Sequence, residues 1–282
     1  MSQVINTNLA SLNAQRNTAM SQSSLSTSMQ RLSSGLRVNS AKDDAAGLAI
    51  AERMNAQVRG MNVAIRNAND GISLAQTAEG ALAKVGDSLQ RMRELGVQAR
   101  NATNTSADKD SLNKEFAELQ KEILRVLGGT TFNGLAILAG NSGTQTFQVG
   151  ANTTANDRID VITTDMTAAA EITNVTGSSA VIDNTANGAA IDTVIQNLDV
   201  ALDKVNGERA TLGASQNRFD AVISNLQVSV ENQSSARSRI MDADFAVETA
   251  NLSRAQILQQ AGNTMVAQAN QLPQQVLALL RS

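Results

Sequence analysis

The sequence predicts a mainly α-helical protein, in which the N- and C-terminal halves form a long antiparallel helical bundle or coiled coil with one or two small β-hairpins in the middle. The first observation is that apolar residues recur at alternating steps of three and four from Ile191 to Leu279. This spacing is typical of a helix packed lengthwise against other helices. The second is that the N-terminal part of the chain has a similar stripe. The third is that turn motifs and period-two alternation are concentrated between the two halves, at about residues 130–165.

The front of the chain contains three predicted helices. The first stripe covers residues 1–36 and ends at the Ser- and Gly-containing turn of residues 33–40. A second helix begins at Ser40 or Asp43 and extends to about Arg100. A third helix ends at Gly128 and Gly129, and its short connection to the second helix predicts an antiparallel hairpin.

The middle of the chain changes character. Residues 144–149 alternate with period two, and residues 159–163 are rich in β-branched side chains, which predicts β-hairpins within about 130–165. Residues 166–188 are rich in Ala, Thr, Ser and Asn without a strong period, and we expect a short variable loop that is exposed.

The last helix changes character along its length. Its seam is apolar from Ile191 to Val230, polar at several positions from Gln233 to Arg254, and apolar again from Leu258. We therefore expect two domains. The terminal coiled-coil domain would contain residues 1–42 and 241–282, with linkers at about 33–42 and 233–246, and the helical-bundle domain would contain residues 43–240.

The composition excludes most catalytic chemistry. The 282 residues include no His, Cys, Trp or Tyr, one Pro, and five Phe as the only aromatic residues. A Ser-His-Asp triad, a disulfide and a thiolate site are therefore impossible, and no phosphate loop or dinucleotide-binding motif occurs. The acidic clusters Asp43-Asp44 and Asp242 to Asp244 are explained by helix capping and solvation. We expect no enzyme activity, no catalytic residue, no cofactor and no metal site.

Charge and hydropathy restrict the partners. The net charge of −3 argues against nucleic-acid binding. No segment is long and apolar enough for a membrane span, and residues 1–20 lack the features of a secretory signal peptide. Any export would therefore use a different route.

The apolar stripes at both ends of the chain predict interaction surfaces. Copies of a rod that pack head to tail through such stripes form an open filament when the rotation between them does not close. The candidate self-assembly residues are the apolar stripe positions near the two termini. They are Ile5, Leu9, Leu12, Leu32, Leu36, Leu258, Met265, Leu272, Val276 and Leu279.

Several long motifs resemble one family. They are Asn6-Thr7-Asn8, the run from Ser33 to Ile50 (SSGLRVNSAKDDAAGLAI), Ser234 to Ile240 (SSARSRI), Ser253 to Gly262 (SRAQILQQAG) and Ala269 to Leu277 (ANQLPQQVL). These motifs resemble bacterial flagellin, and the resemblance covers residues 1–140 and 190–282. It implies a secreted protein that self-polymerises into the extracellular flagellar filament, the propeller for motility. The middle segment is short, so we expect a form without large outer domains.

The resemblance also implies partners. These are other flagellin copies, flagellar cap and junction proteins, the type III export apparatus, and a cytosolic export chaperone at the C-terminal helices. Residues 90–98 resemble the segment that vertebrate innate-immune receptors bind in flagellins, which makes Gln90, Arg91, Leu95 and Glu115 candidate receptor contacts. The alternatives are a hook–filament junction adaptor, with similar terminal helices, and an unrelated coiled-coil interaction protein.

Overall fold

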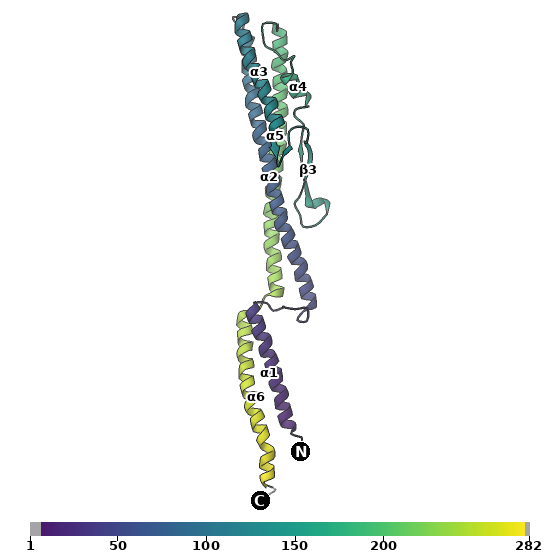
Figure 1. Cartoon of the computed structure of the whole chain (residues 1–282), viewed down its shortest axis with the longest axis vertical. Coiled ribbons are helices and arrows are strands. Elements are labelled where there is room, and N and C mark those ends of the chain that lie inside the picture. Colours follow the sequence, from purple (N-terminus) through teal and green to yellow (C-terminus); the bar gives the residue numbers. More distant parts are fainter. Residues whose placement is uncertain (1–6, 280–282) are drawn as a thin grey trace. The chain divides into compact units, whose positions relative to one another are not determined.

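The structure is a computed structural model of the whole chain, and it describes residues 7–279, with the side chains of residues 7–271 (Figure 1). It is mainly helical, which confirms the predicted fold class. The helices are α1 (Leu9–Ser34), α2 (Ala45–Ala99), α3 (Ser106–Gly129), α4 (Ala170–Thr176), α5 (Gly188–Met241) and α6 (Phe245–Leu279). The strands are β1 (Thr131–Phe132), β2 (Leu135–Ala136), β3 (Gly143–Gln148) and β4 (Arg158–Thr163), and one 3-10 turn covers Ala155–Asp157.

The described chain divides into two compact units. One unit combines the residues up to Ala56 with those from Glu231 onward, and the other contains Gln57–Val230. Helices α2 and α5 each contribute residues to both units. We call the first the terminal unit and the second the central unit.

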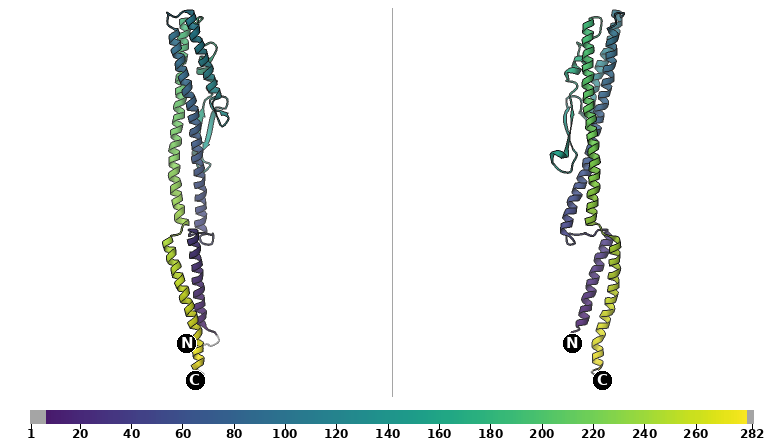
Figure 2. Two further views of the ribbon diagram at one scale, coloured as in Figure 1. Left: turned by 60° about the vertical axis from the view of Figure 1, so that its left-hand side comes forward. Right: turned by 180° about the vertical axis from the view of Figure 1, so that it is seen from behind.

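In the terminal unit, α1 and α6 lie side by side and run antiparallel (Figures 1 and 2). The ends of α1 are well defined by their caps. Asn8 caps its N-terminus by accepting a hydrogen bond from the backbone amide of Ser11 at 3.1 Å. Gly35 ends it in the left-handed conformation, with φ of 70°, which favours glycine because it has no Cβ.

The connections to α1 and α6 lie together in the same unit. Leu36 forms an isolated antiparallel bridge with Asp242. A small core of Val38, Ala51 and Met241 packs beside it. Helix α5 extends to Met241, so most of the expected linker at 233–246 is helical and the break is confined to residues 242–244. The polar seam residues from Gln233 onward do not interrupt the helix, because polar side chains weaken packing but keep the backbone hydrogen bonds.

The central unit is a bundle of α2, α3 and α5. Arg100, directly after α2, pairs with Asp192 of α5 at 2.8 Å, and further ion pairs connect α2 to α5 at Arg93–Asp199 (2.6 Å) and Arg209–Glu79 (2.8 Å). From one ion pair to the next, the residue number rises on α5 while it falls on the α2 side, so the two helices are antiparallel. Completely buried side chains fill the space between the helices, and they include Leu82, Leu89, Met92, Phe116, Ile123, Leu198 and Phe219.

The two small hairpins belong to the central unit, and β3–β4 lies beside the helices (Figures 1 and 2). Strands β3 and β4 pair antiparallel from Gly143 opposite Thr163 to Gln148 opposite Arg158. The inward residues of β4, including Ile159 and Val161, join the helical core. Phe147 packs edge-on against Phe219 of α5 with ring centres 5.7 Å apart.

Residues 166–188 differ from the exposed loop that the sequence suggests. They contain the short helix α4, and Met166, Ile172, Val175 and Ile182 are completely buried. The side-chain amide of Gln120 donates to the carbonyl oxygens of Val175 and Ala180, at 2.8 and 2.9 Å. The few apolar residues of this segment are too widely spaced to produce a periodic signal, yet they are sufficient to dock it.

Candidate self-assembly surface

The contact between α1 and α6 is largely polar and uses small side chains. Asn8 donates from Nδ2 to the carbonyl oxygen of Ala269 at 2.8 Å, and Ser11 Oγ lies 2.7 Å from Asn270 Oδ1. Gly262 faces Thr18 so closely that a Cβ atom would lie 2.5 Å from the Thr18 hydroxyl oxygen. These contacts determine the register of the pair but bury little apolar surface.

Most of the apolar side chains on this pair are uncovered. Of the predicted self-assembly residues, Leu9, Leu12, Leu258 and Met265 are exposed, by 68, 50, 51 and 62%. Leu32 and Leu36 are half-buried. Ile5 lies outside the described residues, as do the side chains of Leu272, Val276 and Leu279, whose backbone belongs to α6.

The structure adds exposed apolar residues to this surface. Those outside the predicted self-assembly set are Met20, Met29, Phe245, Val247 and Ile257, of which Met29 and Val247 belong to the predicted stripes. The helical spacing therefore placed these two residues on the right face without indicating that they stay exposed. The sequence did not indicate Phe245 as a surface residue, because the local pattern does not show that α6 begins there.

Charge is sparse and unevenly placed on α1 and α6. Arg16 and Arg31 are the charged residues of α1, and Glu248 and Arg254 those of α6. The carboxylate of Glu248 is nearly buried, and one of its oxygens lies 3.9 Å from Arg31 Nη1. This ion pair connects the two helices near one end.

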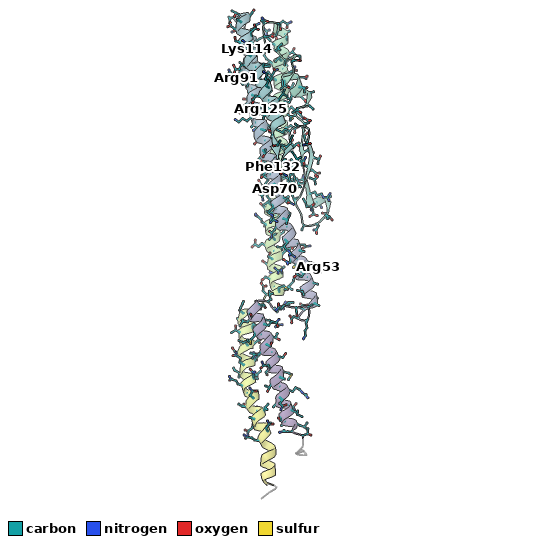
Figure 3. All side chains as sticks on the ribbon, viewed as in Figure 1. Arg53, Asp70, Arg91, Lys114, Arg125 and Phe132 are labelled. Carbon is teal, nitrogen blue, oxygen red and sulfur yellow. The ribbon has the colours of Figure 1, made fainter. Side chains whose placement is uncertain are left out.

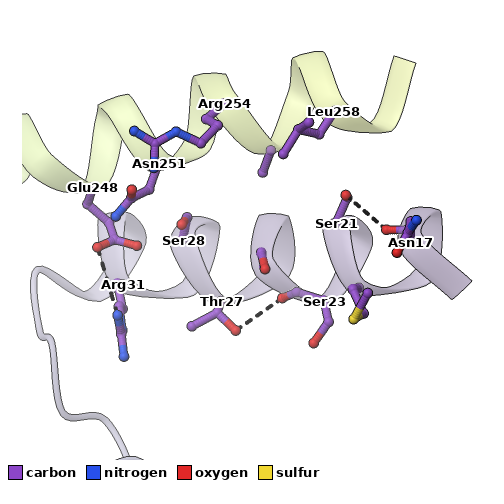
Figure 4. A pocket seen from close by; sticks show the side chains of 13 residues that line it. Asn17, Ser21, Ser23, Thr27, Ser28, Arg31, Glu248, Asn251, Arg254 and Leu258 are labelled. Atoms are coloured by element: carbon purple, nitrogen blue, oxygen red, sulfur yellow. Dashed lines mark hydrogen bonds and ion pairs between the residues drawn. The ribbon is translucent and has the colours of Figure 1, made fainter. Parts of the chain in front are cut away.

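A groove of about 710 Å³ lies between α1 and α6, next to that ion pair. Figure 4 shows Ser21, Thr27 and Arg31 on the α1 side, with Arg254 and Leu258 on the α6 side. The lining is mainly hydroxyl and amide groups, with Met20 and Leu258 as its large apolar members.

The four candidate receptor residues have different environments in the central unit. Gln90, Arg91 and Glu115 are exposed, whereas Leu95 is completely buried. Arg91 of α2 contacts Glu115 of α3 at 2.8 Å and Glu94 at 2.9 Å (Figure 3 labels Arg91). The hydrogen bond to Glu115 is the main cause that raises the pKa of Arg91 above its ordinary value. The structure thus brings Arg91 and Glu115 together and makes Leu95 part of the core.

The arrangement offers contact surfaces rather than reactive groups. Among residues 7–279, no group of three or more His, Cys, Asp or Glu side chains could hold a metal ion. Within the same residues, no helix has the length and apolar character needed to cross a membrane.

Comparisons with known proteins agree with the motifs at both ends. Residues 5–143 match the bacterial flagellin N-terminal helical region, and residues 195–280 match the bacterial flagellin C-terminal helical region. The chain is 46% identical to a flagellin of Halalkalibacterium halodurans over 278 residues, covering 99% of this chain and 100% of that one. It is 43% identical to a flagellin of Bacillus subtilis over 304 residues, covering 98% and 99%.

A solved structure shares the fold at low sequence identity. It is described as a flagellar hook-associated protein from Vibrio parahaemolyticus, with a TM-score of 0.62, 14% identity, and coverage of 71% of this chain and 100% of that one. Likeness at this identity concerns the fold alone, whereas the relatives that match nearly end to end are flagellins. The chain therefore belongs to the bacterial flagellin family, the non-enzymatic subunits of the extracellular flagellar filament.

Proposed function

We propose that the exposed apolar side chains of α1 and α6 are the contacts through which copies of this flagellin polymerise. The observation that carries the proposal is the exposure of Leu9, Leu12, Leu258 and Met265 on a helix pair with little apolar surface of its own buried. An apolar stripe with no cover in the single chain marks an interaction surface. Ile5, Leu32, Leu36, Leu272, Val276 and Leu279 complete the proposed set.

The driving force is the removal of these side chains from water. Complete burial of one Leu or Met contributes about 1.5–3 kcal/mol. Association also costs translational and rotational freedom, so several such residues must act together. The polar register contacts between α1 and α6 contribute less to this driving force, because their hydrogen bonds replace bonds to water.

The experiment is polymerisation of purified protein, induced by a precipitating salt. A Leu258→Ser/Met265→Ser double variant should raise the critical concentration for filament growth by at least about tenfold, since each tenfold change corresponds to only about 1.4 kcal/mol. A matched control on the same helix is Gln256→Ser/Gln260→Ser, which exchanges exposed polar residues. The proposal fails if the apolar and polar variants polymerise with the same critical concentration.

We also propose that the terminal helices and their linkers, at about residues 1–42 and 241–282, form a distinct assembly domain, and that residues 43–240 form the next domain outward. The short middle segment supports a filament without large outer domains. Cap and junction proteins would contact the same terminal helices. A cytosolic chaperone would cover the apolar face of the C-terminal helix before export through the type III apparatus.

A second proposal concerns the free monomer. The exposed pair of Arg91 and Glu115, with Gln90 beside it, is the part of the α2–α3 surface that an innate-immune receptor would contact. Leu95 would act only by supporting α2 from within the core. Arg91→Ala should abolish receptor activation by monomer while leaving polymerisation intact, and Lys121→Ala, on the exposed surface of α3, is the control. Full activation by the Arg91 variant would contradict this proposal.

A further inference from the structure

We infer that the groove between α1 and α6 receives the start of α6 from a second copy of this chain. The inserted segment is residues 242–247, which we call the α6 corner. Its Phe245 would sit between Met20 and Leu258 of the groove, and its Asp242 would meet Arg254. This inference rests on the proposed self-assembly through the terminal helices and specifies one of its contacts.

The groove contains one positively charged side chain that is unpaired among the described residues, Arg254, and two exposed apolar side chains, Met20 and Leu258. Arg254 is exposed, and its guanidinium has no hydrogen bond or ion pair with any residue that the structure describes. Arg31, by contrast, already faces Glu248 across the helix pair (Figure 4). Met20 and Leu258 are exposed by 56 and 51%. The site therefore matches a segment that brings one large apolar side chain and one carboxylate.

The α6 corner has this composition. Phe245 is exposed by 58% and Val247 by 55%. Asp244 is occupied within its own chain, because its carboxylate accepts hydrogen bonds from the backbone amides of Ala246 and Val247, at 2.9 and 3.2 Å. Asp242 is exposed, and its carboxylate has no partner in the described part of the chain. Phe245 and Val247 thus supply apolar surface for an external contact, and Asp242 supplies a carboxylate.

The α6 corner cannot occupy the groove of its own chain. Phe245 and Arg254 lie on the same helix nine residues apart, a separation of about 13 Å along its axis. In chain order, Asp242 lies just before α6 and Arg254 lies within it, so a copy shifted along the helix axis would bring the carboxylate of one chain toward the guanidinium of the other. A contact that joins two different surfaces of identical subunits is heterologous and allows continuous addition of copies.

A charge exchange tests the ion pair. Arg254→Glu and Asp242→Arg should each raise the critical concentration for polymerisation on the order of tenfold, because each places like charges at the contact. The double variant Asp242→Arg/Arg254→Glu should restore polymerisation to within about threefold of the wild type. Circular dichroism of the monomers controls for folding. Failure of the double variant to recover, with all monomers equally helical, would overturn the ion pair.

A cross-link tests the position of the segment directly, because the natural chain has no cysteine. Filaments are grown from a mixture of an Ala246→Cys protein and a Ser24→Cys protein, then oxidised. Ser24 lines the groove, whereas Ser26 on the same helix does not. The inference expects mixed disulfide dimers with Ser24→Cys and at least about fivefold fewer with the Ser26→Cys control, since residues two apart lie on nearly opposite faces of a helix.

The outcomes separate this inference from the proposed function. Filaments that form normally but give equal cross-linking at positions 24 and 26 would overturn the groove contact and leave self-assembly through the terminal helices standing. If the unmodified chain forms no filament under polymerising conditions, the proposed function fails and the groove contact fails with it.

Discussion

At the residue scale, two glycines of α2 show what the sequence could and could not indicate. The sequence places Gly71 and Gly80 inside a predicted helix, where each costs about 1 kcal/mol relative to Ala. The two glycines differ in how closely other side chains pack against them. A Cβ at Gly71 would lie 2.5 Å from Cζ of the buried Phe219, whereas nothing lies within 4 Å of a Cβ at Gly80. The close approach of α2 to Phe219 involves a distant part of the chain, so local spacing could not predict it.

The two positions should therefore respond in opposite directions. Gly71→Ala should lower the free energy of unfolding by about 1–3 kcal/mol, because the core around Phe219 must shift. Gly80→Ala should raise it by about 0.5–1 kcal/mol, because the helix loses a flexible residue without a clash. Urea denaturation of the two monomers measures both. Equal effects would show that α2 does not approach Phe219 as described.

Asp108 gives a prediction that depends on pH. The hydroxyl of Thr105 donates to the carboxylate of Asp108 at 2.7 Å, and the Thr105 backbone amide donates to it at 2.9 Å, which lowers the pKa of Asp108 below its ordinary value of 3.8. Because the folded pKa is depressed, the stabilisation is complete above the ordinary value and is lost as the pH falls through the folded pKa.

Thr105→Ala should therefore return the pKa of Asp108 toward its ordinary value. The stability difference between wild type and variant should be largest near neutral pH and should shrink in acid. An NMR titration of the Asp108 carboxyl carbon measures the pKa, with Thr103→Ala in the preceding turn as the control. An unchanged Asp108 titration in Thr105→Ala would rule out this capping contact.

At the element scale, the terminal helices show which features the apolar periodicity can predict. The stripes predicted that the two ends of the chain pair, and α1 and α6 do so. They placed the break between α5 and α6 only within a broad linker at about residues 233–246, because the seam turns polar at Gln233 while the backbone stays helical to Met241. They also did not reveal that the buried residues of α1 are Ser11, Leu25 and Ser28, so that its contact with α6 contains little apolar surface.

This weak interface predicts a large change on assembly. Backbone amides of α1 and of residues 245–271 should exchange with solvent rapidly in the monomer, because the helices open readily when little apolar surface is buried. In the filament, their exchange should slow by at least about a hundredfold. The completely buried part of α2 around Leu82 and Leu89 is the internal reference, protected in both states. Equal protection of α1 and α2 in the monomer would contradict the argument.

At the scale of the whole molecule, the two units differ in the size of their cores and in their exposed apolar surface. The central unit contains the large core, joined by α2–α5 ion pairs and completed by the docked hairpin and α4. The terminal unit has a much smaller core and carries more of the exposed large apolar residues than the central unit does. The sequence motifs identified the family, because they are long and occur at both ends. The exact groove and its free Arg254 required coordinates, since they depend on how α1 and α6 face each other.

We expect self-assembly to depend on the terminal helices, whereas folding of the central unit does not depend on them. The measurement that tests it most directly is electron microscopy of the full chain and of a chain ending at Ala246, both after salting out. We expect long uniform filaments from the full chain, none from the truncated chain, and the same cooperative thermal unfolding of the central unit in both monomers. Filaments of normal length from the truncated chain would contradict it.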